Sequence, residues 1–313
     1  MKAVILTDGK AGHESQSKAL ARALGLEPEI VRVRFRSPLC KLLSYALDRL
    51  GIRSLSLLEF PDGPAPDAGL YIGTGSGTFY AVKALAAAAR HRGRSAKCAA
   101  VLFPRGYHLP SFDCIVAPIF DNLPNLPNVV PVPVNLVAAD EEYYRAGVET
   151  FRERHAASPR PAAAVVVGGP NARAKMSPDW MRTQLERIFE ETEGCERWVT
   201  TSRRTPPAVE AVIDSFPFDY KLVYSRDHFN PIPAFVSLAK RLYVTADSTG
   251  MLSEACSFGS AEVYALDNLG GGRHKFRRFL EALSGGGYLG PAARKANLAA
   301  QFATAKRLCG LEE

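Results

Sequence analysis

The chain of 313 residues is 47% hydrophobic and 23% charged, which excludes a wholly disordered protein and favours two globular domains. Its net charge of +7 is spread along the sequence without an aromatic–basic signature, which argues against nucleic-acid binding and favours a phosphate-bearing small ligand or an anionic lipid surface. The six cysteines form no CxxC pair, and no apolar run reaches the length of a membrane helix or an export signal, so we expect no bound metal, reduced thiols and a cytoplasmic protein.

Short apolar runs alternate with stretches of helical spacing in the first half of the chain, which predicts parallel α/β structure. We expect strands at residues 3–7, 29–35, 69–75, 98–103 and 114–118, and an edge strand in the proline-rich segment 128–134. Helices are expected at residues 15–24, 38–51, 78–92 and 139–155.

A second α/β series begins after the linker-like sequence SPRP at residues 158–161. Strands are expected at residues 162–167, 197–202, 221–225, 242–247 and 261–266. Helices are expected at residues 180–193, 206–215, 231–240, 250–258, 273–284 and 290–308. The two series predict a first domain over 1–157, a second over 158–289, and a C-terminal helix within 290–313 that packs back on the first domain.

Two loops of the first half place glycine or small polar residues directly after a predicted strand, at the sheet edge where α/β proteins bind ligands. In the loop after the first strand, His13, Asp8 or Glu14 is a candidate general base; the alternative is a turn whose polar residues cap the next helix. The loop after the third strand carries Gly73, Gly75 and Ser76, without the spacing of a Walker A or complete Rossmann motif.

Two loops of the second half have the same placement. The first of them contains Gly168, Gly169, Pro170 and Asn171, and the turn one strand later contains Ser202, Arg203 and Arg204. Two arginines beside hydroxyl groups are suited to phosphate recognition, with a solvated turn as the alternative.

The last such loop leads from a strand into a helix. Asp247 and Ser248 open the helix, and Met251, Ser253 and Glu254 follow within it. Glu254 is placed to bind a ribose diol, whereas Asp247 and Ser248 also fit a simple helix-capping role.

The segment 34–53 combines five basic residues with the apolar sequence LLSYALDRL. It fits either a basic amphipathic helix in peripheral contact with the inner membrane face or an ordinary helix packed on its sheet. The ordinary helix is the favoured interpretation.

The strings LTDGKAGHESQSKALARALG, VVVGGPNA, TTSRRTPP and VTADSTGMLSEACSFG follow one another over most of the chain. They resemble the mitochondrial-fission Elm-type family, and the TADS…M.SEA string is the most specific part of that resemblance. The family is similar in layout to glycosyltransferases of the B type (GT-B), especially the lipid-linked peptidoglycan N-acetylglucosaminyltransferase. The resemblance implies an α/β fold of two Rossmann-like domains whose parallel sheets face each other across a cleft.

The resemblance also implies roles for particular residues. The glycine-rich loop with a histidine in such transferases is matched by Gly9, Gly12 and His13. Their GG-small motif is matched by Gly168, Gly169 and Pro170, although Pro170 replaces the common serine and so removes one hydroxyl and one backbone donor. The ribose-binding glutamate corresponds to Glu254, and the donor-sugar contact corresponds to His274, Lys275 and Phe276.

The implied function is metal-independent transfer of a sugar from a nucleotide-diphosphate donor, used as co-substrate without a bound cofactor. The acceptor is unknown, with a lipid-linked acceptor as one option, and the acceptor-recognition loops show no clear match to those transferases. His13 is the first choice of base, with Asp8 or Glu14 behind it. Two alternatives stay open: a non-catalytic nucleotide-binding or scaffold protein on the same fold, and a nucleotide-sugar epimerase.

Overall fold

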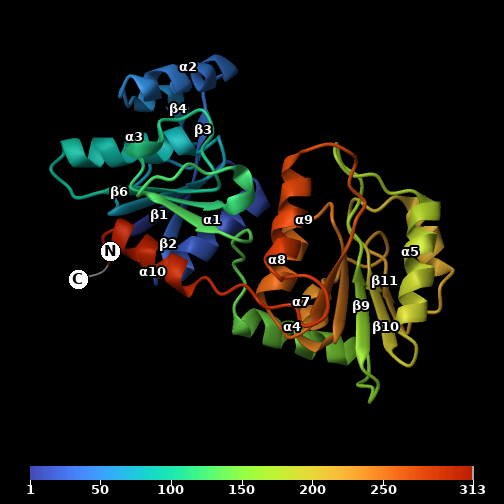
Figure 1. Cartoon of the computed structure of the whole chain (residues 1–313). Coiled ribbons are helices and arrows are strands. Elements are labelled where there is room, and N and C mark those ends of the chain that lie inside the picture. Colours follow the sequence, from blue (N-terminus) through green and yellow to red (C-terminus); the bar gives the residue numbers. More distant parts are fainter. Residues whose placement is uncertain (312–313) are drawn as a thin grey trace. The chain divides into compact units, whose positions relative to one another are not determined.

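The computed structural model describes residues 1–311, which form two α/β units (Figure 1). The first unit comprises Met1–Ala138 together with the chain from Asn297 on, and the second comprises Ala139–Ala296. Each unit has its own parallel sheet, so the predicted α/β class with two parallel sheets is confirmed.

The first unit contains a six-stranded sheet in the order β2-β1-β5-β6-β7-β8, in which all neighbours are parallel. Its strands are β1 (Ala3–Thr7), β2 (Pro28–Arg32), β5 (Leu70–Thr74), β6 (Lys97–Val101), β7 (Cys114–Pro118) and β8 (Val129–Val132). A small antiparallel ribbon joins β3 (Arg34–Phe35) to β4 (Leu58–Glu59). The helices are α1 (Ala11–Ala23), α2 (Pro38–Arg49), α3 (Phe79–His91) and α10 (Ala299–Leu308).

Alternate side chains of the first sheet enter two different cores, as expected for a parallel sheet covered on both faces. Ala3 and Ile5 of β1 pack with Leu20 of α1 and with Ala305 of α10. Their neighbours on β1 point to the other face, where the core includes most of α3. Strands β1, β5 and β7 are therefore buried along their whole length, which explains their nearly continuous apolar sequences, whereas the edge strand β2 is mostly exposed.

The second unit contains a five-stranded parallel sheet in the order β11-β10-β9-β12-β13. Its strands are β9 (Ala162–Val166), β10 (Glu196–Thr200), β11 (Tyr220–Leu222), β12 (Arg241–Thr245) and β13 (Glu262–Leu266). The helices are α4 (Glu141–Arg154), α5 (Pro178–Glu191), α6 (Pro207–Asp214), α7 (Ile232–Leu238), α8 (Thr249–Ser257) and α9 (Lys275–Gly285). A core under α5 and α6 is built from Val165, Val199 and Met181, among others.

The boundaries differ from the sequence expectation in several places. The chain passes into the second unit at Ala138/Ala139 rather than at 157/158, because α4 packs against α7. Residues 290–296 stay with the second unit, and the final helix begins only at Ala299. Residues 312 and 313 of the expected C-terminal segment lie outside the described part of the chain.

Two local expectations are also corrected. The strand expected at 29–35 is divided, because Arg34 and Phe35 leave the main sheet and pair with β4. The helix expected from residue 15 already begins at Ala11. Within residues 1–311, no helix is both long and apolar enough to cross a bilayer.

Candidate functional site

The strand orders define one crevice in each unit. In the first sheet β2 lies on one side of β1 and β5 on the other; in the second, β10 and β12 flank β9 in the same way. Ligands of open parallel sheets bind at the carboxyl ends of strands where the strand order reverses in this manner. The relevant edges are therefore those after β1 and β5, and after β9 and β12, which are the edges that carry all four predicted loops.

In the first unit, the loops after β1 and β5 come together in what we call the β1–β5 loop cluster, comprising Asp8–His13 and Gly75–Gly77. The His13 imidazole lies on the first turn of α1, with its Nδ1 at 3.1 Å from Asp8 Oδ1. Lys10 Nζ is 3.1 Å from the other carboxylate oxygen. Burial raises the pKa of the Asp8 carboxyl, but the hydrogen bonds from Lys10 and His13 outweigh it, so that the pKa lies below its ordinary value.

An ionised Asp8 accepts a hydrogen bond from the His13 Nδ1–H group and thereby directs the Nε2 lone pair of a neutral imidazole away from itself. A carboxylate behind an imidazole is the arrangement that orients a histidine base. The sequence left Asp8 and Glu14 as equal partners for His13. The structure pairs Asp8 with His13, while Glu14 forms an ion pair with Lys18 at 2.7 Å.

The glycines of this cluster are required by close packing. Gly75 has a φ of +84°, and a Cβ built there would lie 2.4 Å from His13 Cε1. A Cβ on Gly77 would lie 2.9 Å from Asp8 Cβ, and one on Gly73 would lie 2.6 Å from Thr78 Oγ1. The loop after β5 can therefore approach the Asp8–His13 pair only because positions 75 and 77 lack side chains, whereas Gly73 in β5 makes room for Thr78.

The same loop retains hydrogen-bonding capacity. Among the described residues, the backbone N–H groups of Gly75, Ser76 and Gly77 have no intramolecular acceptor, and they precede the N-terminus of α3. Unpaired N–H groups at such a point form a favourable environment for an anion. Gly9 differs, because its N–H group donates to Thr7 Oγ1 at 3.1 Å, and Gly12 lies inside α1.

In the second unit, the buried carboxylate of Asp247 joins three loops. Its Oδ2 accepts hydrogen bonds from Gly169 N at 3.0 Å and from Arg204 at 2.7 Å, and its Oδ1 accepts one from Asn268 at 3.2 Å. The cap of α8 is instead Ser248, which accepts from Met251 N at 3.4 Å. Asp247 thus fixes the loops after β9, β10 and β13 against the end of β12.

The glycine pair at 168–169 has no free donor for a ligand. Gly168 N donates to Thr245 Oγ1 at 2.8 Å, and Gly169 N donates to Asp247. A Cβ on Gly168 would lie 2.3 Å from Asp247 Oδ2, and one on Gly169 would lie 2.2 Å from the Arg204 carbonyl oxygen. The pair is therefore explained by the packing of the surrounding loops.

Neighbouring predicted residues also have internal partners. Asn171 accepts from Arg173 N at 2.8 Å and forms a bridge with Ala174, so it shapes a turn that continues through Pro170. The Arg204 guanidinium is bonded to the Gly169 carbonyl at 2.8 Å as well as to Asp247, which makes Arg204 a clamp between loops.

A pocket of about 320 Å³ opens at the carboxyl ends of β9 and β10, and we call it the β10–α7 pocket. Its wall contains Val166, Thr200, Thr201, Ser202, Arg203, Arg204, Tyr224, Phe229, Asn230, Pro231, Ile232, Ser248 and Met251. The structure thus brings together five predicted residues: Ser202, Arg203, Arg204, Ser248 and Met251.

The wall of the β10–α7 pocket combines polar residues with aromatic and aliphatic ones. Arg203 has no bonded partner among residues 1–311, and the N–H groups of Thr249 and Gly250 at the start of α8 are likewise unpaired there. Tyr224 and Phe229 contribute aromatic rings to the same wall. Positive charge with free N–H groups suits a phosphate, and flat apolar side chains suit a base.

Sequence reasoning missed the residues between β11 and α7. Tyr224, Phe229, Asn230 and Ile232 line the pocket, although no glycine motif marks this segment. Its only available signal was a short run of aromatic and turn-forming residues after a predicted strand.

Glu254 lies one helical turn after Met251 on α8, but it is not part of the pocket wall. Its Oε1 accepts a hydrogen bond from the Tyr144 hydroxyl of α4 at 3.1 Å. Burial raises the pKa of the Glu254 carboxyl above its ordinary value, and the Tyr144 hydrogen bond partly counteracts this. The adjacent Tyr143 receives a hydrogen bond from Asn230, which does line the pocket.

The remaining predicted residues are not brought to this pocket. Ser253 is buried within α8. His274 caps α9 by accepting from Arg277 N at 3.2 Å, and its Nε2 is 3.1 Å from the Gly270 carbonyl oxygen. Lys275 and Phe276 follow as the first residues of α9.

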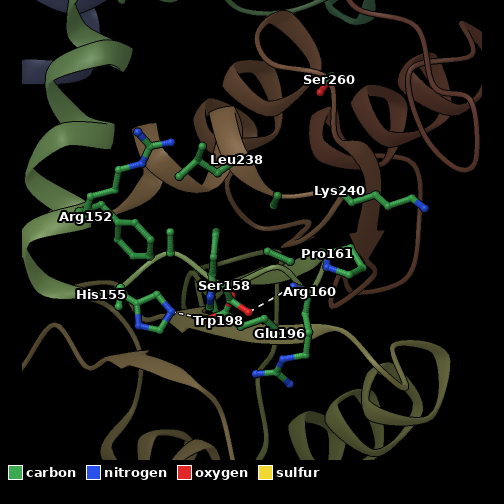
Figure 2. A pocket seen from close by; sticks show the side chains of 15 residues that line it. Arg152, His155, Ser158, Arg160, Pro161, Glu196, Trp198, Leu238, Lys240 and Ser260 are labelled. Atoms are coloured by element: carbon green, nitrogen blue, oxygen red, sulfur yellow. Dashed lines mark hydrogen bonds and ion pairs between the residues drawn. The ribbon is translucent and has the colours of Figure 1, made fainter.

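A further cavity, of about 360 Å³, lies at the opposite, amino-terminal edge of the second sheet (Figure 2). Its wall includes the starts of β9 and β10, and a hydrogen bond joins His155 Nε2 to the buried Glu196 carboxylate. Around this pair pack the rings of Phe151 and Trp198. No residue predicted from the sequence lines this cavity, and its position is not the ligand-binding edge of a parallel sheet.

A family model described as mitochondrial fission ELM1 matches residues 11–309, which confirms the family resemblance predicted from the sequence. The uncharacterized protein RP120 of Rickettsia prowazekii is 30% identical over 128 residues, covering 38% of this chain and 35% of that protein. The chain thus spans about a third of the length of that relative.

Solved structures with a similar fold include two bacterial proteins. The UDP-GlcNAc 2-epimerase of Neisseria meningitidis bound to UDP-GlcNAc has a TM-score of 0.49 at 12% identity, over 97% of this chain and 90% of its own. MurG of Acinetobacter baumannii has a TM-score of 0.47 at 13% identity, over 99% of this chain and 93% of its own. The chemistry of this chain has to be argued from its own residues.

Proposed function

The chain belongs to the mitochondrial fission ELM1 family, and we propose that it is a glycosyltransferase that takes a nucleotide-diphosphate sugar as donor. The observation that carries the proposal is the β10–α7 pocket, because it combines an unpaired arginine and free helix N–H groups with an aromatic wall at the ligand-binding edge of its sheet. In this proposal the chain uses no bound metal, and its cations and N–H groups stabilise the leaving diphosphate.

The proposed placement of the donor follows from the chemistry of the residues in the pocket wall. The base would lie against Tyr224 and Phe229, and the diphosphate against Arg203 and the start of α8. Arg204 contributes indirectly, since its guanidinium is bonded to Asp247 and Gly169 and so holds the loop that carries Arg203. Glu254 is the candidate partner of the ribose by the family resemblance; it does not line the pocket itself, but it follows by one helical turn Met251, which does.

The β1–β5 loop cluster supplies the base in this proposal. His13 Nε2 would take the proton of the acceptor hydroxyl as that oxygen attacks the anomeric carbon, and the nucleoside diphosphate would leave with the bonding electrons. Asp8 would stabilise the resulting imidazolium at 3.1 Å. The unpaired N–H groups of Gly75–Gly77 would hold an anionic group of the acceptor. We extend the proposal to a lipid-linked acceptor and a cytoplasmic protein in peripheral contact with a membrane.

The two alternatives to a transferase differ from it in whether the nucleotide sugar is consumed and whether an acceptor is needed. A nucleotide-binding scaffold would bind the donor without turnover, and a nucleotide-sugar epimerase would change the sugar without any acceptor. The Asp8–His13 pair favours an enzyme over a scaffold, because a scaffold has no need for an oriented imidazole at a ligand-binding edge.

Thermal stabilisation by a panel of nucleotides and nucleotide sugars tests the donor site. A ligand at 100 times its dissociation constant adds about 2.7 kcal/mol to the free energy of unfolding, which gives a measurable shift of the melting temperature. Arg203→Ala should remove most of that shift. Arg182→Ala, which also removes an exposed arginine from the second unit, is the matched control and should retain it. The absence of any shift across the panel would refute the donor site.

Release of free nucleotide then separates the three activities. A transferase releases nucleoside diphosphate only when acceptor is present, and His13→Ala should abolish the release while leaving the thermal shift unchanged. Conversion of the sugar without acceptor would instead establish the epimerase.

A further inference from the structure

Helix α2 exposes much of its apolar surface. Its fully buried residues are polar, Ser44 and Asp48, and Cys40, Tyr45 and Leu47 pack partly buried against the core, whereas its other leucines face solvent. Leu39, Leu42 and Leu50 expose 75%, 67% and 73% of their surface. With 3.6 residues per turn, the exposed apolar positions 39, 42, 43, 46 and 50 fall within an arc of about 100°.

The exposed apolar surface continues beyond the helix. Ile52 and Leu55 are also exposed, so that six of the ten large hydrophobic side chains exposed on residues 1–311 lie between positions 39 and 55. We call the surface formed by Leu39, Leu42, Leu43, Leu50, Ile52 and Leu55 the leucine face. Concentration of this kind in one short segment marks an interaction surface, whereas single exposed leucines do not.

A buried ion-pair cluster fixes this orientation of α2. Asp48 Oδ1 lies 2.6 Å from Lys83 Nζ of α3 and 3.2 Å from Arg53, and Asp48 Oδ2 accepts a hydrogen bond from His108 N at 2.6 Å. Rotating the helix to bury its leucines would take these charges apart, which costs several kcal/mol. The leucine face is therefore held outward by the packing of its own polar side.

The charge of the segment around the leucine face is predominantly positive, although Arg34 is paired with Glu59, which directly follows this segment. Residues 32–58 contain six basic side chains and a single acidic one, Asp48, which is buried and paired. Arg49, the last residue of α2, is exposed and has no hydrogen-bonded or ion-paired partner among residues 1–311. Exposed arginines beside an apolar stripe are complementary to anionic lipid headgroups above an acyl layer.

The inner side of α2 contacts the β1–β5 loop cluster directly. Lys41 Nζ donates to Ser76 Oγ at 3.0 Å, and Ser44 Oγ is 3.1 Å from the Tyr107 hydroxyl, which in turn lies 3.5 Å from the Ser76 carbonyl oxygen. The leucine face and this loop, whose free N–H groups adjoin His13, thus lie on opposite sides of helix α2.

We propose that α2 lies in the surface of an anionic bilayer, with its leucine face inserted among the acyl chains, and that the acceptor reaches the β1–β5 loop cluster from that bilayer. The helix is 12 residues long, about 18 Å, so it lies along the interface rather than across it. The lipid-borne acceptor rests on the proposed transferase function, whereas the docking of α2 does not.

Vesicle sedimentation of the purified full chain tests the docking. The chain should sediment with vesicles of equal parts phosphatidylcholine and phosphatidylglycerol and bind about tenfold less to phosphatidylcholine alone, and added salt should weaken the binding. Combined Leu39→Ser, Leu42→Ser and Leu50→Ser should reduce the partition coefficient by more than about tenfold, because inserted apolar area drives such binding.

The matched control is the pair Ile30→Ser and Ile119→Ser, which removes apolar side chains that are 41% and 45% exposed elsewhere in the first unit. This control should sediment like the unmodified chain. The leucine variant should keep its melting temperature, since the replaced side chains have few internal contacts, and a measurement of melting verifies that it is folded.

Two results would overturn the proposal. One is equal sedimentation of the leucine variant and the unmodified chain. The other is that the unmodified chain binds neither vesicle type and forms a dimer in solution, and that the leucine variant is a monomer. The leucine face would then join two copies of the chain. Neither result depends on nucleotide. The vesicle experiment therefore tests the docking of α2, and the thermal-shift experiment tests the donor site independently.

Discussion

Replacing Asp247 by asparagine tests whether this residue holds the second-unit loops together. The substitution conserves shape, but it removes the charge that faces Arg204 and turns one acceptor oxygen into an amide donor. Since Oδ2 accepts from both Gly169 N and Arg204, and Oδ1 accepts from Asn268, either orientation of the amide places a donor against a donor.

The expected loss of stability follows from these contacts. A buried donor without an acceptor costs about 1–3 kcal/mol, and loss of a charged hydrogen bond costs about 1.5–3 kcal/mol. The Arg204 side chain is 42% exposed and can regain water, which reduces the second contribution. We therefore expect a net destabilisation of about 3 kcal/mol, or roughly 6–12 °C for a unit of this size.

Differential scanning calorimetry of the full chain measures the effect. Asp267→Asn is the matched control, because Asp267 forms an ion pair with Arg277 at the surface of the same unit. The control should lose less than about 1 kcal/mol. Equal melting temperatures for the two variants would refute the view that Asp247 organises the loops, and unchanged nucleotide affinity in Asp247→Asn would separate those loops from the proposed donor site.

Three further changes test other parts of the molecule. Gly75→Ala places a side chain at a φ of +84° and 2.4 Å from His13, so it should destabilise the first unit by about 1–3 kcal/mol; an unchanged melting temperature would contradict the packing. Burial lowers the pKa of Lys83 from 10.5 to about 8, so between these pH values the unfolded chain binds more protons than the folded one. The free energy of unfolding measured in urea should therefore rise with pH over this range, and Lys83→Met should lose that rise. Tyr144→Phe removes a hydrogen bond that lowers the pKa of Glu254, so the acidic loss of nucleotide affinity should move to higher pH in Kd measurements, whereas a general structural defect would weaken binding equally at every pH.

The sequence predicted what depends on local patterns. Apolar runs with two buried faces marked the strands, so that the edge strand at Val129–Val132 was found despite its proline. The sequence-based prediction failed where contacts between distant parts of the chain determine the local structure. Nothing in the run 29–35 indicates that Arg34 and Phe35 leave the sheet, because the ribbon that they form depends on the distant residues of β4.

The sequence did not predict which side of α2 faces inward, for the same kind of reason. A helix with a leucine stripe is expected to bury that stripe, and the ordinary interpretation was favoured. The deciding interaction is between Asp48 and Lys83 of α3, and a sequence does not show that these two charges meet inside the protein. Only the contact reveals that the polar side faces inward.

Glycine after a strand carried the site prediction, and the structure separates two roles that such glycines have. At 168–169 the N–H groups are bonded internally and the missing side chains make room for Asp247 and Arg204, so the motif positions a loop and leaves any phosphate to Arg203 and α8. At 75–77 the missing side chains make room for Asp8 and His13, and the N–H groups remain unpaired among residues 1–311. A glycine loop is a candidate for direct contact with a ligand only when its backbone N–H groups are unpaired, as they are at 75–77. At 168–169 these donors are already used within the protein. By this criterion the proposed anion contacts are backbone N–H groups in the β1–β5 loop cluster, and a side chain together with a helix start in the second unit.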